Sequence, residues 1–135
     1  KNLKRLVQQL DLKNDVIFLD NISQKYKSSL LKKSHLFIMP SIFYKKSVEG
    51  FGISFIEAAQ HGIPSIGGKD GGASDAIIHK ETGLICDGND LNAIYQSIEY
   101  MFQENRYLEF GKKAKDFSKK FDWSLTVKKY IDLLN

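Results

Sequence analysis

Residues 48–72, VEGFGISFIEAAQHGIPSIGGKDGG, hold the local signals that decide the fold of this 135-residue chain. A glycine turn, EGFG, leads directly into a helix expected over about residues 52–61, and Gly62 is a typical residue to end it. The apolar run IPSIGG at residues 63–68 predicts a buried strand, and KDGGASDAI predicts a glycine-rich loop with a short helix. This order is typical of a parallel α/β sheet.

The flanking segments continue the alternation of short apolar runs and amphipathic helices. Before the turn we expect a helix with Leu3, Leu6, Val7 and Leu10 on one face, a strand in DVIFLD (15–20), a helix over 24–33 capped by Ser23, and a strand in HLFIMP (35–40). After the turn we expect a strand in TGLIC (82–86), a helix capped by Asp90, a helix through residues 107–117 and a last helix over 123–134.

Short uninterrupted apolar strands between helices predict parallel strands that are covered on both faces. We therefore expect a single domain over residues 1–135, with an α/β, Rossmann-like, doubly wound parallel sheet of four strands. The chain does not begin with Met and opens inside a helical pattern. We accordingly expect an excised fragment that lacks at least one βα element of its domain.

Composition narrows the classes of function only weakly. Hydrophobic residues make up 42% of the chain and charged residues 27%, which is ordinary for a globular domain. Cys86 lies in the apolar run TGLIC and is expected to be a buried, inert thiol. His35, His61 and His79 lack the spacing of metal ligands, so we predict no metal site.

The net charge of +4 suits a nucleic acid, an anionic membrane surface or a phosphorylated ligand. The lysines are spread over several segments, and the chain contains no recognisable nucleic-acid-binding module. No apolar run approaches the roughly 18 residues needed to cross a bilayer. Charge alone does not choose among the three partners.

Three loops should meet at one edge of the predicted sheet, because ligands of such folds bind outside the carboxyl ends of the strands. These loops are residues 20–23, 40–52 and 67–74. Two of them contain glycine clusters, which let backbone N–H groups come close to a ligand. The candidate site is therefore the rim formed by EGFG and GGKDGG.

The turn EGFG places unpaired backbone N–H groups at a helix N-terminus, where phosphate groups bind. The amides of Phe51, Gly52 and Ile53 are candidates to hold a pyrophosphate, with Glu57 reaching a ribose and Glu49 a sugar on the other side. In the plainer interpretation, Glu49 complements the helix dipole and Glu57 faces solvent. Residue chemistry leaves both interpretations open.

The stretch VEGFGISFIEAAQHGIPSIGGKDGGASDAI resembles the donor-binding core of the retaining GT-B glycosyltransferases of family 4, the glycosyl transferases group 1. Their Glu-x7-Glu pattern around Gly-Phe-Gly is matched by Glu49 and Glu57, and the resemblance continues through VIFLDNIS, SHLFIMPS, TGLICDGND and FDWSLTVKKYIDLL. It implies transfer of a hexosyl group from a GDP- or UDP-sugar to a glycan or lipid-linked acceptor, without a metal or other cofactor. It also implies a cytoplasmic enzyme that makes peripheral contact with the inner face of the membrane if the acceptor is a lipid.

Carried over residue by residue, the resemblance assigns a donor site. Glu49 would contact hydroxyls of the donor sugar and belong to the catalytic set, and the backbone of Gly50–Ile53 would meet the sugar and the diphosphate. Glu57 would hold the ribose hydroxyls. Ile22 matches the position whose backbone meets the nucleobase, and Lys27 is expected nearby. Neither glutamate is interpreted as a proton shuttle.

The resemblance extends to the last helix, and in other segments the sequence departs from the usual family pattern. The helix over residues 123–134 resembles one that crosses back onto an N-terminal domain, with Trp123 as a packing anchor. The long loop SIFYKKS and the sequence GGASD are closer to the phosphatidylinositol mannosyltransferase-like branch. In that branch Lys45 and Lys46 either approach the acceptor or phosphates or are solvated loop residues, with the second role favoured. Asp75 either does the work of the usual Glu or caps the short helix. The family's phosphate-binding Arg and Lys and its acceptor site lie upstream, so the chain alone is expected to be inactive.

Two other classes of function remain as alternatives. The first is a non-catalytic nucleotide-binding or interaction module that has kept the fold, which intact Glu49 and Glu57 argue against. The second is nucleic-acid binding through the basic surface, which predicts a steep dependence of DNA affinity on salt. We expect no nucleic-acid partner.

Overall fold

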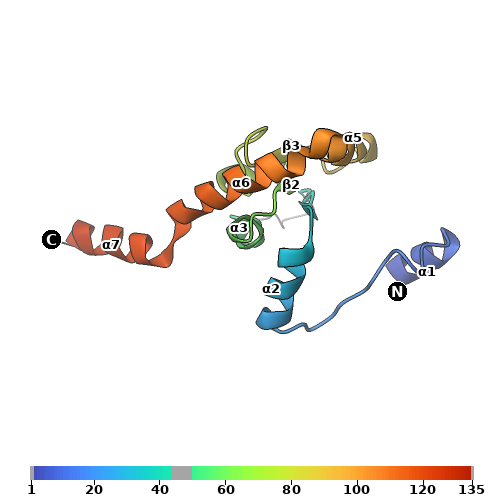
Figure 1. Ribbon diagram of the computed structural model, residues 1–135, viewed down its shortest axis with the longest axis horizontal. Coiled ribbons are helices and arrows are strands. Elements are labelled where there is room, and N and C mark those ends of the chain that lie inside the picture. Colours follow the sequence, from blue (N-terminus) through green and yellow to red (C-terminus); the bar gives the residue numbers. More distant parts are fainter. Residues whose placement is uncertain (1, 44–49, 135) are drawn as a thin grey trace.

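The computed structural model describes residues 2–43 and 50–134, which form a parallel sheet with helices packed on both faces (Figure 1). Strands β1 (Phe37–Met39), β2 (Ser65–Gly68) and β3 (Gly83–Cys86) lie in that order, and both pairings are parallel. Ile66 of β2 lies opposite Ile38 of β1 and Leu84 of β3. The predicted α/β, Rossmann-like class is confirmed.

From α2 to α5 the helices and strands alternate as predicted. In chain order they are α1 (Asn2–Gln9), α2 (Gln24–Lys33), α3 (Ile53–Gln60), α4 (Ala73–Ala76), α5 (Leu91–Phe102), α6 (Arg106–Ser118) and α7 (Trp123–Leu134), with the 3-10 turns η1 (Gln103–Asn105) and η2 (Lys119–Phe121). The predicted N-caps are confirmed, because the Ser23 hydroxyl accepts a hydrogen bond from Tyr26 N and Asp90 accepts from Asn92 N and Ala93 N.

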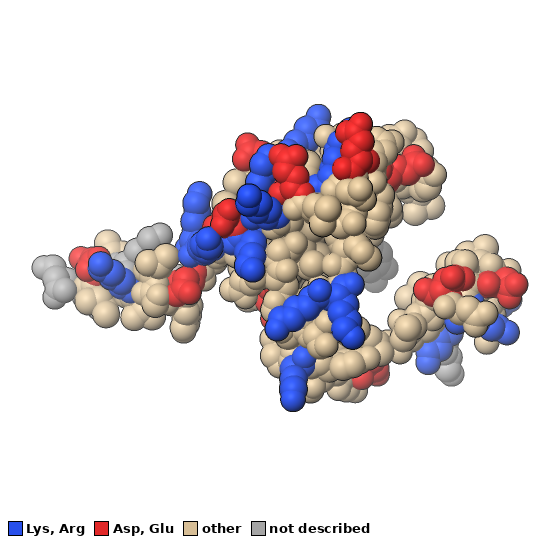
Figure 2. Space-filling view, in the orientation of Figure 1, with Lys and Arg blue, Asp and Glu red and all other residues tan. Residues whose placement is uncertain are grey.

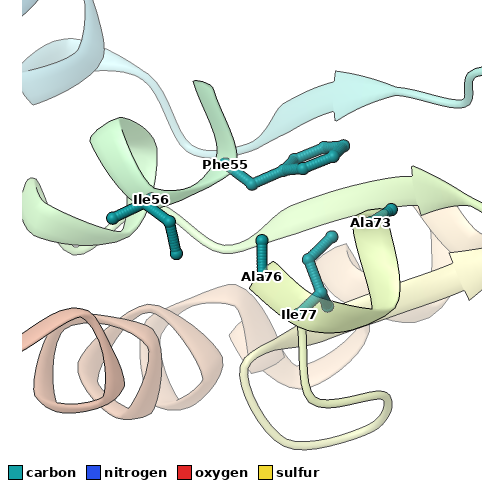
Figure 3. Packing of buried hydrophobic residues seen from close by; sticks show 5 residues of the cluster. All are labelled: Phe55, Ile56, Ala73, Ala76 and Ile77. Carbon is teal, nitrogen blue, oxygen red and sulfur yellow. The ribbon is translucent and has the colours of Figure 1, made fainter. Parts of the chain in front are cut away.

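Two apolar clusters cover the two faces of the sheet. On one face the clustered residues come from α3 and from α4 with its C-cap, and they are Phe55, Ile56, Ala73, Ala76 and Ile77 (Figure 3). On the other face the sheet residues Ile66, Leu84 and Cys86 pack against Met101 of α5 and Phe110 of α6. All four residues of β2 are buried, so this strand lies at the centre of the core.

The prediction of a strand in residues 15–20 is wrong. Residues 16–20 form no ladder with any described strand, and Ile17 and Phe18 are 81% and 44% exposed. The segment runs as a loop between α1 and α2, apart from the sheet (Figure 1). An apolar run becomes a strand only when a neighbouring strand accepts and donates its backbone hydrogen bonds, and residues 16–20 do not pair with any described strand. The sheet therefore has three strands among the described residues, where the sequence predicted four.

The first and last helices extend away from the sheet (Figures 1 and 2). The predicted helix at the start is confirmed as α1, yet the leucines predicted for its apolar face are exposed, namely Leu3 and Leu6 in α1 and Leu10 directly after it. Helix α7 also exposes large apolar side chains, including Trp123 and Leu133. No helix in the described part of the chain is both long and apolar enough to cross a membrane.

We predict that Ile66→Ala lowers the free energy of unfolding by about 2–5 kcal/mol, because Ile66 is 0% exposed at the centre of the sheet and its loss leaves a cavity. The matched control is Ile38→Ala in the neighbouring strand. Ile38 is 42% exposed, so the same truncation should cost clearly less. Chemical denaturation followed by circular dichroism measures both changes, and equal costs would contradict the assignment of the core to β2.

Candidate functional site

The loops that follow the three strands are tied to one another at the carboxyl edge of the sheet. Lys69 N donates a hydrogen bond to the Cys86 carbonyl oxygen at 2.8 Å, and the Lys69 ammonium lies 2.6 Å from Asp87 Oδ2. Phe43 N donates to Asp70 Oδ2 at 3.1 Å. The predicted meeting of the loops 40–52 and 67–74 is confirmed at these contacts.

The turn before α3 is shaped by two glycines. Gly52 is the N-cap of α3 and has the left-handed values φ 74° and ψ 55°, which a residue with a side chain rarely adopts. Gly72 packs so closely against the turn that a β-carbon at residue 72 would overlap the carbonyl oxygen of Gly50. The backbone of residues 50–52 therefore lies directly against the glycine-rich loop after β2.

An aromatic contact holds the same turn from another direction. The ring of Phe51 lies 5.5 Å, centroid to centroid, from the ring of Phe121 in η2. Phe51 and Ile53 both remain exposed to solvent. The first N–H groups of a helix have no hydrogen-bond partner inside that helix. Because α3 begins at the surface, its first N–H groups are available as hydrogen-bond donors. The turn can thus present backbone donors to an anion at the rim.

Glu57 lies in the second turn of α3, and its carboxylate is contacted by two side chains of α2. The Lys27 ammonium lies 2.8 Å from Glu57 Oε1 and 2.9 Å from Oε2, and Gln24 Nε2 donates to Oε1 at 3.3 Å. The side chains of Lys27 and Glu57 are 36% and 27% exposed. The Ser28 hydroxyl of α2 and Nε2 of His61, the C-cap of α3, are 3.1 Å apart. These contacts join α2 to α3.

The hydrogen bond from Lys27 lowers the pKa of Glu57 below its ordinary value of 4.5, although partial burial opposes the change. Gln24 and the nearby His61 lower this pKa further. A depressed pKa in the folded state means that the ion pair stabilises the fold above the pKa of the unfolded chain and that this contribution is lost as the pH falls through the folded pKa. Glu57 is therefore a carboxylate at neutral pH.

The structure brings several predicted site residues together. Gly50, Phe51, Gly52 and Ile53 form one continuous turn, and Glu57 follows it on α3. Lys27 is in direct contact with Glu57. Its predicted place near the nucleobase, beside Ile22, stays a prediction.

Other predicted residues are placed less directly. Ile22 is partly exposed and immediately precedes Ser23, the N-cap of α2, whose first residue contacts Glu57. Glu49, Lys45 and Lys46 lie outside the described residues, and the roles predicted for them stay predictions.

Two polar residues of this edge were missed by the sequence interpretation. Gln24 lies three positions before Lys27, on the same face of α2, and this helical spacing is the signal that could have pointed to it. Asp70 accepts a hydrogen bond from the backbone of Phe43 across the rim. No local pattern in the sequence indicates that contact, because the two residues meet only when the loops after β1 and β2 pack together.

Of the two roles considered for Asp75, capping of the short helix is wrong, and replacement of the family's Glu stays a prediction. Gly72 occupies the N-cap position of α4, and Asp75 lies in the first helical turn, where a negative charge complements the helix dipole. Cys86 is buried as predicted, and burial raises the pKa of its thiol. The described part of the chain contains no group of three His, Cys, Asp or Glu side chains that could hold a metal ion.

Comparisons with known proteins point to one family. The family model described as glycosyl transferases group 1 matches residues 1–121. A GDP-mannose-dependent alpha-(1-6)-phosphatidylinositol monomannoside mannosyltransferase of Mycobacterium tuberculosis is 32% identical over 89 residues, which are 64% of this chain and 23% of that protein. The mouse alpha-1,3/1,6-mannosyltransferase ALG2 is 39% identical over 87 residues, which are 64% of this chain and 20% of that protein.

Structural similarity supports the same fold. A crystal structure of HepE from Anabaena in complex with UDP superimposes with a TM-score of 0.85 at 20% identity, covering 98% of this chain and 35% of that protein. The chain thus spans roughly a fifth to a third of the length of these three proteins. With a family match over residues 1–121 and the Rossmann-like sheet of the GT-B enzymes, the chain belongs to the glycosyl transferases group 1 family.

Proposed function

We propose that this chain is the donor-binding domain of a retaining glycosyltransferase, which transfers a hexosyl group from a GDP- or UDP-sugar to a glycan or lipid-linked acceptor. The observation that carries the proposal is the turn at Gly50–Ile53, which opens α3 beside the Gly72 loop and lies one turn before the carboxylate of Glu57. The turn offers backbone donors, and the carboxylate offers acceptors. A nucleoside diphosphate needs both.

Each part of the nucleotide sugar has a matching group at this edge. The N–H groups at the start of α3 bind the diphosphate and stabilise the charge that develops on it when the sugar leaves. Glu57 accepts hydrogen bonds from the ribose hydroxyls, with Lys27 beside it and the backbone of Ile22 near the base. Glu49 is assigned to hydroxyls of the transferred sugar and to the catalytic set. No metal takes part in this scheme.

The names of relatives support the class of donor. The mycobacterial relative is named for its dependence on GDP-mannose, and the Anabaena neighbour was solved with UDP. GDP-mannose and UDP share a ribose and a diphosphate, which are the parts that Glu57 and the α3 turn address. The base, the sugar and the acceptor are left open within this proposal.

We place the rest of the active site in other parts of the full-length protein. Helix α7 exposes apolar side chains such as Leu125, Val127 and Ile131, which suit packing against an N-terminal domain that carries the acceptor site. We further propose that the protein works in the cytoplasm, with peripheral contact to the inner face of the membrane if its acceptor is a lipid.

A non-catalytic nucleotide-binding module is the second candidate, because a bound nucleotide by itself requires no transfer. Turnover separates the two. Release of nucleoside diphosphate from the donor sugar in the presence of acceptor supports the transferase, whereas tight nucleotide binding without turnover of any donor sugar supports the module.

We predict that Glu57→Gln in the full-length protein weakens the binding of GDP or UDP by about 1.5–3 kcal/mol, tenfold or more, because hydrogen bonds to a charged acceptor are lost. Isothermal titration calorimetry measures the change. The matched control is Glu109→Gln, which removes a carboxylate paired with Lys113 on α6 and should leave nucleotide affinity unchanged. Equal affinity of the wild type and Glu57→Gln would contradict the ribose assignment.

We predict that Gly72→Ala disrupts donor binding, because its methyl group would occupy the position of the Gly50 carbonyl oxygen and displace the turn. The affinity for the nucleoside diphosphate should fall by at least about tenfold, as expected when backbone donors are misplaced. Ser74→Ala, at an exposed position of α4, is the control and should bind normally. Normal binding by Gly72→Ala would argue against a role for the turn.

The depressed pKa of Glu57 predicts how this affinity depends on pH. The wild type should bind the nucleotide more tightly than Glu57→Gln by a factor that stays constant from about pH 8 to about pH 5, because Glu57 keeps its charge over this range. This factor should fall toward one only below the ordinary pKa of 4.5. Taking the ratio cancels the titration of the phosphate groups, which is common to both proteins. A ratio that collapses near pH 6 would contradict the prediction.

A further inference from the structure

We infer that Lys27 is a positioning residue for donor binding, whose ammonium group holds the Glu57 carboxylate in the orientation that receives the two ribose hydroxyls. The inference rests on the proposed function, and it goes further by making Lys27 act through Glu57 instead of on the nucleotide. We further infer that the Gln24 amide donates a hydrogen bond to the Glu57 carboxylate while no ribose is bound, and that a ribose hydroxyl replaces this amide on binding.

The first support is the geometry of the ion pair. Lys27 Nζ contacts both oxygens of Glu57, at 2.8 and 2.9 Å. The terminal torsion of a glutamate side chain has a broad energy minimum, so a carboxylate with one contact can still turn. Contacts to both oxygens oppose that rotation. Lys27 itself is placed by α2, whose N-terminus is fixed by the Ser23 cap.

The second support is a count of hydrogen-bond acceptor sites. An ionised carboxylate accepts at about four lone-pair positions. Lys27 uses one on each oxygen and Gln24 uses a second on Oε1, so one position on Oε2 stays open among these contacts. A ribose diol donates two hydrogen bonds and therefore needs one more position than the carboxylate has free.

The two partners differ in how easily they can be displaced. The contact with Gln24 is long, 3.3 Å, exposed and made by a neutral amide. The contacts with Lys27 are short, partly buried and made by a charged group, and such hydrogen bonds are roughly twice as strong as neutral ones. The diol should therefore replace Gln24 and leave Lys27 in place. Lys27 remains the group that orients the Glu57 carboxylate when the nucleotide is bound.

The decisive measurement is a ratio of affinities in the full-length protein. GDP and UDP are titrated beside 2′-deoxy-GDP and 2′-deoxy-UDP, which lack one of the two ribose hydroxyls. We expect the wild type to prefer the ribonucleotide by about tenfold, the worth of a hydrogen bond to a charged acceptor. Lys27→Met should reduce this preference to within about twofold, because a freely turning Glu57 no longer selects the diol.

Two matched variants control for charge and for shape. Lys25→Met removes the same charge from an exposed position of the same helix and should keep the wild-type preference, even if both affinities fall slightly with the loss of a positive charge. Lys27→Arg can also donate to both carboxylate oxygens and should restore most of the preference. Thermal unfolding by circular dichroism checks that each variant is folded.

The outcomes separate this inference from the function on which it rests. If Lys27→Met weakens ribonucleotides and deoxynucleotides equally and keeps the preference, Lys27 contacts the nucleotide itself or is merely structural, and the positioning role is wrong. If Lys27→Met binds ribonucleotides more tightly, Lys27 competes with the ribose and the inference is also wrong. If the wild type shows no preference at all, the ribose role proposed for Glu57 fails first.

The exchange of Gln24 has its own test. Gln24→Ala should bind the ribonucleotide as well as the wild type or slightly better, because no amide has to be displaced. A loss of about tenfold in Gln24→Ala would mean that the amide stays in the bound state, and it would overturn the exchange.

Discussion

Strand β2 is the element on which the rest of the structure depends. It is hydrogen-bonded to β1 on one edge and to β3 on the other, and all four of its residues are buried. Because its two neighbours are parallel to it, the loops that leave all three strands emerge at the same edge. Both faces are covered, with Ile66 facing the cluster that α5 and α6 complete. The position of every loop at the rim follows from this one strand.

The candidate site is built mainly from backbone at that rim. The absence of a side chain at Gly72 lets the loop after β2 touch the turn at Gly50, and the left-handed conformation of Gly52 turns the chain into α3. A phosphate site made from main-chain N–H groups needs this close approach and little else. Side-chain chemistry enters in the second turn of α3, at Glu57, where α2 supplies a lysine and an amide. The backbone donors proposed for the anion are thus held where the turn before α3 meets the loop after β2. The carboxylate proposed for the hydroxyl groups is held by the contact between α2 and α3.

The sequence predicted the local features of this arrangement well and the long-range ones poorly. The caps at Ser23 and Asp90, the start of α3 and the three short strands depend on neighbouring residues, and periodicity and cap chemistry reveal them. The run VIFLD was expected to be a strand because it is apolar and branched, yet Ile17 is exposed, since no described strand lies beside it. The residue type of Asp75 made capping one of its two possible roles, whereas Gly72 holds the N-cap position.

The sequence by itself determined the α/β alternation, the glycine turn before α3 and the placement of Glu57 one and a half turns after it. Each of these follows from the helical and extended periods of the chain and from the conformational freedom of glycine. Only the tertiary structure decided that Lys27 and Gln24, some 30 residues before Glu57, are the partners of its carboxylate, and that Gly72 closes on Gly50. Contacts between segments that are distant in the chain depend on how α2, α3 and the loops pack around β2. No local pattern of residues records that packing.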